Sequence, residues 1–351
     1  MVQDSKPEVS VLYPNRPAAN IGGGTAAANT TAMPTAQPAV SHRDANHFWP
    51  GRRVLVAGGT HGFGLVLARQ LAARGVRLLL VGRSSASARE AIACCEAAAA
   101  AAGQPVDGIH GLSADLARPG EGHRAVAVCL EKLDGLDSLF YCIGRSSRTA
   151  LLSLPPDELR EAVEVNLMTA VEISQAAAVP ICRAGGELVY IGSLAGKLVT
   201  PAMGAYAVGK AALAAFADAV RLEVVPQGGR VLLVSPGPIR REPNPATAAD
   251  TDGGFHRYDD DVARHGLPEN VAAPGGGAAV ELLDPEQLAT EVLDACQRGQ
   301  IELTRPWKAT LLAGLIEWFP GRGRRLLARF ATKGRAGDGN LPGVSGADRR
   351  S

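Results

Sequence analysis

Short runs of apolar residues alternate along this chain with longer stretches in which apolar residues recur at helical spacing. The runs predict strands near residues 53–57, 77–81, 107–112, 138–142, 187–191, 230–234 and 301–303. Continuous apolar runs are typical of parallel strands that are buried on both faces. Because helical stretches separate the strands, the pattern predicts an α/β fold, a doubly wound parallel sheet of about seven strands with helices on both faces and right-handed crossovers.

Two segments lack this alternation. Residues 1–49 are rich in Ala, Pro, Thr, Gly and Asn and have no apolar signal-peptide core, which predicts a disordered tail. Residues 240–284 shift to Pro, Gly, Asp and Ala, which predicts a long loop inside a domain of residues 50–305. An apolar and basic extension over 306–335 and a flexible end over 336–351 complete the predicted organisation.

Composition narrows the class of protein. The formal charge of +1 over 351 residues lacks the basic excess of a nucleic-acid-binding protein. The six cysteines have no Cys-x-x-Cys spacing, so we expect reduced thiols and a cytoplasmic protein. The seven histidines show no ligand spacing either, and we expect no metal site.

A glycine-rich turn joins the first predicted strand to a helical stretch. Glycines there let the backbone approach a diphosphate, while the helix N-terminus adds unpaired amides and the positive end of its dipole. The first two glycines, Gly58 and Gly62, stand one residue further apart than in the common dinucleotide fingerprint. We expect cofactor contacts along this turn at Gly58, Thr60, His61, Gly62, Phe63 and Gly64.

Tyr206 and Lys210 have the i,i+4 spacing that puts two side chains on one face of a helix. A phenol is a poor acid at neutral pH, and a fixed cation in a poorly solvated cleft lowers its pKa. Bringing that pKa from about 10 to near 7 requires about 4 kcal/mol of differential stabilisation of the phenolate. Ser193 follows a predicted buried strand and would hold a substrate carbonyl beside the phenol.

With these motifs in this order, the chain resembles a short-chain dehydrogenase/reductase of the single-domain Rossmann type over roughly residues 51–304. The resemblance implies a catalytic set of Asn166, Ser193, Tyr206 and Lys210, in which Asn166 holds a water that links Lys210 to solvent. It also implies that Tyr206 and Lys210 touch the cofactor. Further cofactor contacts are implied at Asp115, Leu116, Gly144, Pro236, Gly237 and Ile239.

Two departures from the family pattern stand out. The usual Asn-Asn-Ala-Gly after the fourth strand is replaced by Tyr141-Cys142-Ile143-Gly144, so the support of the central strand must differ. The frequent threonine after the Pro-Gly loop is replaced by Arg240-Arg241, which puts the usual contact to the nicotinamide carboxamide in doubt.

Charge at the end of the second strand predicts the choice of cofactor. A ribose diol is normally bound by a carboxylate there, whereas a 2′-phosphate needs a cation. The segment 82–85 has no acid, and it carries Arg83 and Ser84. We therefore expect NADP(H) to be preferred over NAD(H), with Arg83 as the main phosphate ligand and Ser84 as a second donor.

These inferences predict an NADP(H)-dependent oxidoreductase that interconverts a ketone or aldehyde and an alcohol, and a homo-oligomer, either a dimer or a tetramer. Two alternatives remain open. One is a catalytically silent NADP(H)-binding sensor or membrane-associated scaffold. The other is a sugar-nucleotide epimerase or dehydratase, which needs a larger substrate domain than follows Pro236.

The C-terminal extension and the long loop bear on the substrate. Residues 307–333 place apolar and aromatic side chains beside arginines, which suits peripheral contact with an anionic membrane surface or packing over the substrate cleft or a subunit interface. Because some lipid-acting members of the family that the chain resembles have similar tails, the resemblance implies an apolar, lipid-like substrate. In the long loop, a mobile lid or partial disorder fits the composition, and Phe255, His256 and Tyr258 are candidates for substrate contact.

Overall fold

A computed structural model describes residues 48–240, 258–267, 269–276 and 281–332. The expected tail therefore lies outside the described residues apart from Phe48 and Trp49, as does most of the long loop. The described residues from Trp49 onward belong to one compact unit.

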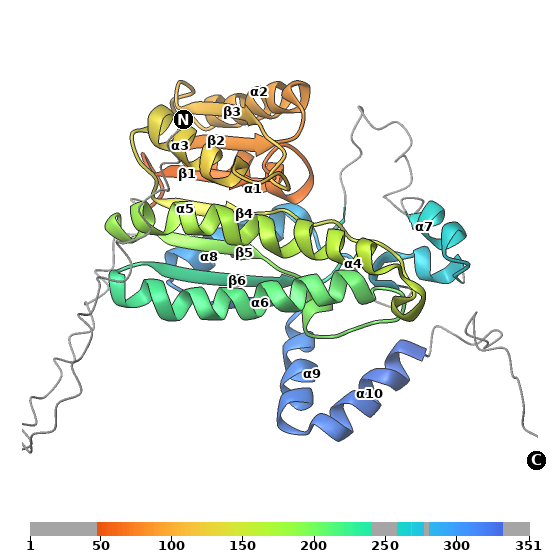
Figure 1. Cartoon of the computed structure of the whole chain (residues 1–351). Helices are drawn as coiled ribbons and strands as arrows, with labels where there is room; N and C mark the ends of the chain where they lie inside the picture. Colours follow the sequence, from red (N-terminus) through yellow and green to blue (C-terminus); the bar gives the residue numbers. More distant parts are fainter. Residues whose placement is uncertain (1–47, 241–257, 268, 277–280, 333–351) are drawn as a thin grey trace, which may run out of the picture. The chain divides into compact units, whose positions relative to one another are not determined.

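Seven parallel strands form one sheet in the order β3-β2-β1-β4-β5-β6-β7 (Figure 1). Their bounds are β1 Arg53–Ala57, β2 Arg77–Gly82, β3 Ile109–Ser113, β4 Ser138–Tyr141, β5 Glu187–Ile191, β6 Arg230–Pro236 and β7 Glu302–Arg305. The central strands are buried along almost their whole length, as continuous apolar runs require. The predicted doubly wound α/β fold is confirmed, with small shifts at strand ends.

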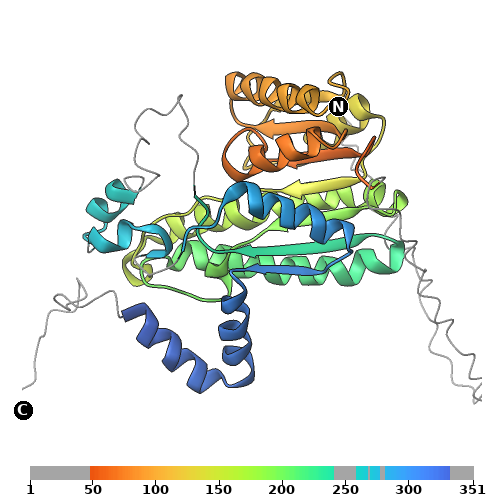
Figure 2. The ribbon, with the colours of Figure 1, turned by 180° about the vertical axis from the view of Figure 1, so that it is seen from behind.

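The helices cover both faces of the sheet. Their bounds are α1 Gly62–Ala72, α2 Ser85–Ala101, α3 Glu121–Leu133, α4 Pro156–Val163, α5 Thr169–Arg183, α6 Gly204–Val224, α7 Asp259–Arg264, α8 Pro285–Gln297, α9 Trp307–Trp318 and α10 Pro320–Thr332. Helices α3, α5 and α6 lie on one face, and α1, α2 and α8 on the other (Figures 1 and 2). This winding reverses between β1 and β4, so a ligand crevice is expected at their carboxyl ends.

The helix from Pro156 to Arg183 is long and apolar enough to cross a membrane, but half of its most apolar window is buried inside the protein. It contains α4, a π-helical turn over Glu164–Met168, and α5, whose inner face packs on β4 and β5. Its apolar residues therefore serve the core of the domain.

Ion pairs link the amino-terminal ends of neighbouring strands in the sheet. The carboxylate of Glu187, 1% exposed, accepts hydrogen bonds from Ser138 Oγ at 3.0 Å and from the Arg230 guanidinium at 2.5 Å. Asp137 accepts from the backbone amide of Arg53 at 2.8 Å and from Arg53 Nε at 2.9 Å. Burial of Asp137 opposes ionisation, but these hydrogen bonds outweigh it and hold the pKa of Asp137 below its ordinary value.

Candidate functional site

The ammonium of Lys210 lies at the centre of the carboxyl edge of the sheet. Lys210 is 3% exposed and sits in the second turn of α6. Its Nζ donates to the backbone oxygens of Ile143 and Ile191, each at 3.0 Å. Burial lowers the pKa of Lys210 to about 8. The group is thus mostly charged at neutral pH, although little water reaches it.

Gly144 makes this position of Lys210 sterically feasible. A Cβ built at Gly144 would lie 2.9 Å from Lys210 Nζ and 3.1 Å from its Cε. Any larger residue would push the ammonium away from the two carbonyls. The glycine that the chain shares with the family pattern here has a direct steric role.

Asn166 is fully buried in the π-helical turn before α5. Its side-chain nitrogen donates to Ala162 O at 2.8 Å and to Arg145 O at 3.1 Å, and its side-chain oxygen accepts from Arg145 N at 3.0 Å. The amide therefore fixes the loop immediately after Gly144. π-Helical turns occur often at functional sites, and this one points Asn166 at the loop whose Ile143 carbonyl holds Lys210.

Tyr206 and Ser193 complete the predicted group. Tyr206 lies half-buried in the first turn of α6, and the Lys210 nitrogen is 6.0 Å from the centroid of its ring. Ser193 follows β5, where its Oγ accepts from Ala195 N at 3.1 Å and so retains its own proton for donation. The structure thus brings Asn166, Ser193, Tyr206 and Lys210 to one edge of the sheet.

The departure at Tyr141-Cys142 has a clear structural basis. The Tyr141 side chain is fully buried, and its hydroxyl lies 2.6 Å from Thr169 Oγ1. It therefore links β4 to α5, and burial raises the pKa of this phenol above its ordinary value. Burial likewise raises the pKa of Cys142 to about 12, so its thiol stays neutral beside Lys210.

In the glycine turn between β1 and α1, the backbone at Gly58 lies close to the backbone at Gly64. A Cβ at Gly64 would lie 2.2 Å from the Gly58 oxygen, and Gly58 and Gly62 have φ of 81° and 53°, which favour glycine. His61, the N-cap of α1, makes no side-chain capping hydrogen bond, so the first amides of the helix remain available to an anion. This arrangement fits a diphosphate.

The other residues of the turn differ in exposure. Thr60 is 5% exposed and packs against Gly82, where an added Cβ would lie 2.1 Å from its Oγ1. His61 is exposed, and its Nδ1 lies 3.0 Å from Thr60 Oγ1. Phe63 is half-buried. Thr60 thus positions the end of β2, whereas His61 and Phe63 are open to a ligand.

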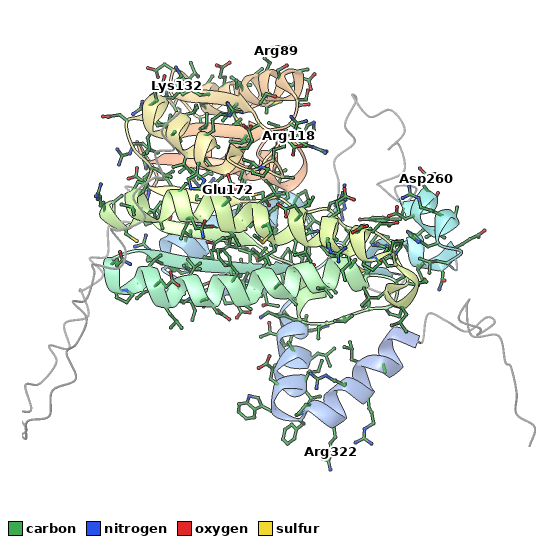
Figure 3. All side chains as sticks on the ribbon, viewed as in Figure 1. Arg89, Arg118, Lys132, Glu172, Asp260 and Arg322 are labelled. Atoms are coloured by element: carbon green, nitrogen blue, oxygen red, sulfur yellow. The ribbon has the colours of Figure 1, made fainter. Side chains whose placement is uncertain are left out.

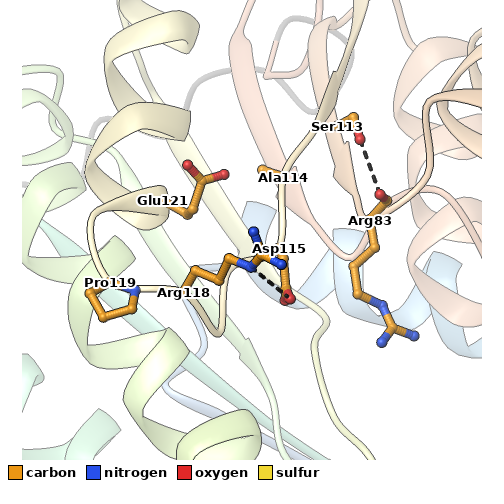
Figure 4. Close-up of a pocket in the computed structure, with 7 residues that line it drawn as sticks. All are labelled: Arg83, Ser113, Ala114, Asp115, Arg118, Pro119 and Glu121. Atoms are coloured by element: carbon orange, nitrogen blue, oxygen red, sulfur yellow. Dashed lines mark hydrogen bonds and ion pairs between the residues drawn. The ribbon is translucent and has the colours of Figure 1, made fainter.

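A cavity lies beyond the ends of β2 and β3. It has a volume of about 510 Å³, and Figure 4 shows Arg83, Asp115 and Arg118 among the residues around it. Ser113 Oγ donates to Arg83 O at 3.0 Å and so connects the two strand ends. The Leu116 side chain is buried in the core, so this residue can offer a ligand only its backbone.

Ser84 also has a structural role in this region, and Arg118 is a residue of the cavity that the sequence did not predict. Ser84 Oγ caps α2 by accepting from Ser87 N at 3.4 Å, which leaves its hydroxyl proton for a second partner. Arg118 lines the same cavity as Arg83, and its side chain is 80% exposed. Its Nε lies 3.8 Å from Asp115 Oδ2. The sequence could have indicated Arg118, because it is a basic residue only three positions after Asp115.

The loop after β6 turns toward β7 and α8. Gly237 N donates to Arg305 O at 2.7 Å, and Ile239 forms a bridge to Leu283. Pro236 ends β6 beside Arg305. Arg240 Nη1 lies 3.8 Å from Asp284 Oδ2. Arg241 is outside the described residues.

Of the three loop candidates for substrate contact, Phe255 and His256 lie outside the described residues. The Tyr258 ring lies against a residue that the sequence did not single out, the guanidinium of Arg148, whose Cζ is 3.7 Å from the ring centroid. Arg148 was missed because its partners are distant in sequence.

Comparison with known proteins agrees with this geometry. The family model described as short chain dehydrogenase matches residues 52–251. The Dehydrogenase/reductase SDR family member 7B of Bos taurus is 30% identical over 285 residues, covering 80% of this chain and 82% of the relative. The 11-beta-hydroxysteroid dehydrogenase type 2 of Homo sapiens is 30% identical over 197 residues, covering 54% of this chain and 46% of that protein.

Solved structures are also similar. A short chain dehydrogenase from Burkholderia cenocepacia J2315 in complex with NADP has 27% identity and a TM-score of 0.57, covering 73% of this chain and 96% of that one. A short-chain dehydrogenase from Streptomyces avermitilis has a TM-score of 0.59 at 21% identity, covers 82% of this chain and 98% of that one, and shares the fold. The chain therefore belongs to the short-chain dehydrogenase family and is an oxidoreductase acting on CH–OH or C=O groups.

Proposed function

We propose that this oxidoreductase uses NADP(H) to interconvert a ketone or aldehyde and an alcohol, on an apolar substrate. The observation that carries the proposal is the buried ammonium of Lys210 beside Tyr206, with Ser193 on the neighbouring strand end. These three groups are the donors and the cation that carbonyl reduction requires.

The preference for NADP(H) rests on charge. The end of β2 carries Arg83, and no carboxylate stands within 82–85. A 2′-phosphate in the cavity near Arg83 would also meet a second cation, Arg118, which lines the same cavity and is paired with Asp115. The related Burkholderia protein was solved with NADP. The glycine turn and the uncapped start of α1 would hold the diphosphate.

Each residue has a defined part in the proposed reaction. Ser193 donates a hydrogen bond to the substrate carbonyl, and Tyr206 gives its proton to the forming alkoxide. Lys210 favours the resulting phenolate through its charge. Asn166 keeps the loop after Gly144 in place, and with it the carbonyl that holds Lys210. Bound NADPH would supply the hydride for the carbonyl carbon.

An apolar substrate and a membrane contact follow from two further observations. A relative that shares 30% identity over about half of its length is named for a hydroxysteroid, which is an apolar substrate class. The helices α9 and α10 expose Trp307, Leu311, Trp318 and Phe319 next to the exposed Arg322, Arg324 and Arg325. Figure 3 shows Arg322 directed away from the sheet. We propose a cytoplasmic protein whose α9–α10 hairpin contacts an anionic membrane surface.

Replacing Tyr206 by Phe should lower kcat for ketone reduction about a thousandfold, because the general acid is lost. The Kd for NADPH, measured by nicotinamide fluorescence, should stay within about twofold, since Phe keeps the ring packing. The substrate is first sought by following NADPH consumption with ketones from small to steroid-sized. Binding of NADPH without turnover of any carbonyl by the unaltered protein would favour a sensor instead.

Replacing Lys210 by Met should remove turnover and yet stabilise the fold near neutral pH. A pKa of about 8 instead of 10.5 means that folding opposes protonation of this lysine, at an upper limit of about 3 kcal/mol. The unfolded chain binds one proton more than the folded chain between pH 8 and 10.5, so wild-type stability should rise with pH across that range. Urea unfolding of both proteins at pH 7 and 10 measures this, and the advantage of the variant should shrink at pH 10. An equal difference at both pH values would contradict the burial argument.

Replacing Arg83 by Ala should weaken NADPH binding about tenfold to a hundredfold and leave NADH binding nearly unchanged, because charge-assisted hydrogen bonds contribute about 1.5–3 kcal/mol. Arg118→Ala should have a smaller effect in the same direction, since that side chain is exposed and ion-paired. Arg89→Ala, an exposed arginine on α2, is the matched control. An equal loss of affinity for both cofactors in Arg83→Ala would refute the 2′-phosphate assignment.

Vesicle flotation tests the hairpin. The protein should bind vesicles of phosphatidylcholine and phosphatidylserine, and replacing Arg322, Arg324 and Arg325 by Gln should weaken binding about a hundredfold, at about 1 kcal/mol for each basic residue. Trp318→Ser with Phe319→Ser should also release the protein, whereas Leu222→Ser, an exposed apolar residue on α6, should not. Equal flotation of all variants would exclude this surface.

A further inference from the structure

Arg148 is a buried cation in the loop that follows β4. Its side chain is the largest of those that are almost completely buried, with 1% of the residue exposed. Burying a guanidinium is costly unless its N–H groups are satisfied. The partners of this side chain therefore indicate why the chain keeps a charge at this place.

Those partners come largely from one distant part of the chain, here called the 258–276 segment (residues 258–267 and 269–276). Arg148 Nε donates to Val271 O at 2.7 Å, and a terminal nitrogen donates to Ala273 O at 3.1 Å. The guanidinium lies over the Tyr258 ring, 3.7 Å from its centroid. The backbone amide of Arg148 donates to Asp261 Oδ2 at 3.1 Å.

The other described attachments of this segment are an ion pair between His265 Nε2 and Glu158 Oε2 at 4.0 Å and a small group of apolar side chains. Its apolar cluster consists of Val262, Val271 and Ala272, with Ala202, Tyr258 and Leu267 at its border. Such a small cluster buries little apolar area, so the hydrogen bonds and the stacking of Arg148 supply much of the attachment.

The segment lies against the residues that lead into Tyr206. Ala202 borders its apolar cluster, and a Cβ built at Gly276 would lie 2.7 Å from the Pro201 oxygen. Met203, which this Cβ would also meet, packs with Tyr206. In Figures 1 and 2, α7 lies near α4, at the end of the sheet where the strands finish. The segment thus contacts the chain three to five residues before the phenol.

We propose that Arg148 is a positioning residue, which holds the 258–276 segment in place as the wall of the substrate site next to Tyr206. The segment would then determine which substrates reach the phenol, and Arg148 would act on the reaction through it. This inference rests on the proposed carbonyl reduction for its substrate role, while the attachment itself does not depend on catalysis.

Electrostatics support this placement. Burial lowers the pKa of Arg148, and interactions with Tyr258, Asp261 and Tyr206 act in the opposite direction. Charge interactions are reciprocal, so the guanidinium also favours the phenolate of Tyr206. Its removal should therefore shift the pH profile of kcat to higher pH, which loss of packing alone would not do.

Hydrogen exchange read by mass spectrometry, together with steady-state kinetics, tests the proposal on the full chain. Arg148→Met should speed exchange in α7 and in 269–276 at least tenfold and leave the sheet unchanged. It should raise KM for the ketone about tenfold, shift the pH profile upward and leave the Kd for NADPH within twofold. Arg148→Lys keeps the charge without the planar fork, so it should restore the pH profile while exchange stays fast. Arg160→Met, an exposed arginine on α4 paired with Asp157, is the control.

Unchanged exchange in the 258–276 segment of Arg148→Met would overturn the proposal. If that variant does not fold, Tyr258→Leu carries the test, because it removes the ring and the hydroxyl that contact the Arg148 guanidinium and leaves Arg148 itself in place, and unchanged exchange there would be equally decisive. Failure of the unaltered protein to reduce any ketone would instead refute the proposed function, and the exchange data would still decide whether Arg148 holds the segment.

Discussion

The site depends on the burial of one ammonium. A charged lysine removed from water is tolerated only if hydrogen bonds replace its hydration, and here two main-chain carbonyls do so, from Ile143 and Ile191. The Ile143 carbonyl follows β4 and the Ile191 carbonyl ends β5, so they converge only because the two strands are neighbours in register, with Tyr141 opposite Tyr190. The sheet thus determines where the charge of Lys210 can lie.

The sequence could predict those parts of the molecule that depend on local pattern. Short strand-like runs predicted the seven strands, and helical spacing placed Tyr206 and Lys210 together on α6. Contacts between distant segments leave no such pattern. The partners of Arg148 in the 258–276 segment lie at least 110 positions further along the chain, so no local pattern singles this residue out. The roles of the predicted site residues stay predictions, since geometry alone does not measure proton transfer.

The ion pairs that stabilise the fold and the candidate catalytic groups lie at opposite ends of the strands. At the amino edge, Glu187 is satisfied by a serine and an arginine, and Asp137 is satisfied by Arg53, so these charges are fully used by the fold. At the carboxyl edge, the ammonium of Lys210 and the hydroxyl of Ser193 retain chemistry that the fold does not require. Substitutions at the two edges should therefore affect different properties of the protein.

The strand order also constrains how the chain folds. Strands β1 and β2 are close in sequence, since Arg53 pairs with Arg77, 24 positions later. Strand β4 is much further from β1: Arg53 is bonded to Asp137, the residue before β4, which lies 84 positions later. Closing the longer loop costs about 1 kcal/mol more chain entropy. Non-local pairings of this kind slow folding. The topology therefore favours early formation of β1–β3 and their helices, with the crevice at the β1–β4 junction completed late, when the second half of the sheet docks.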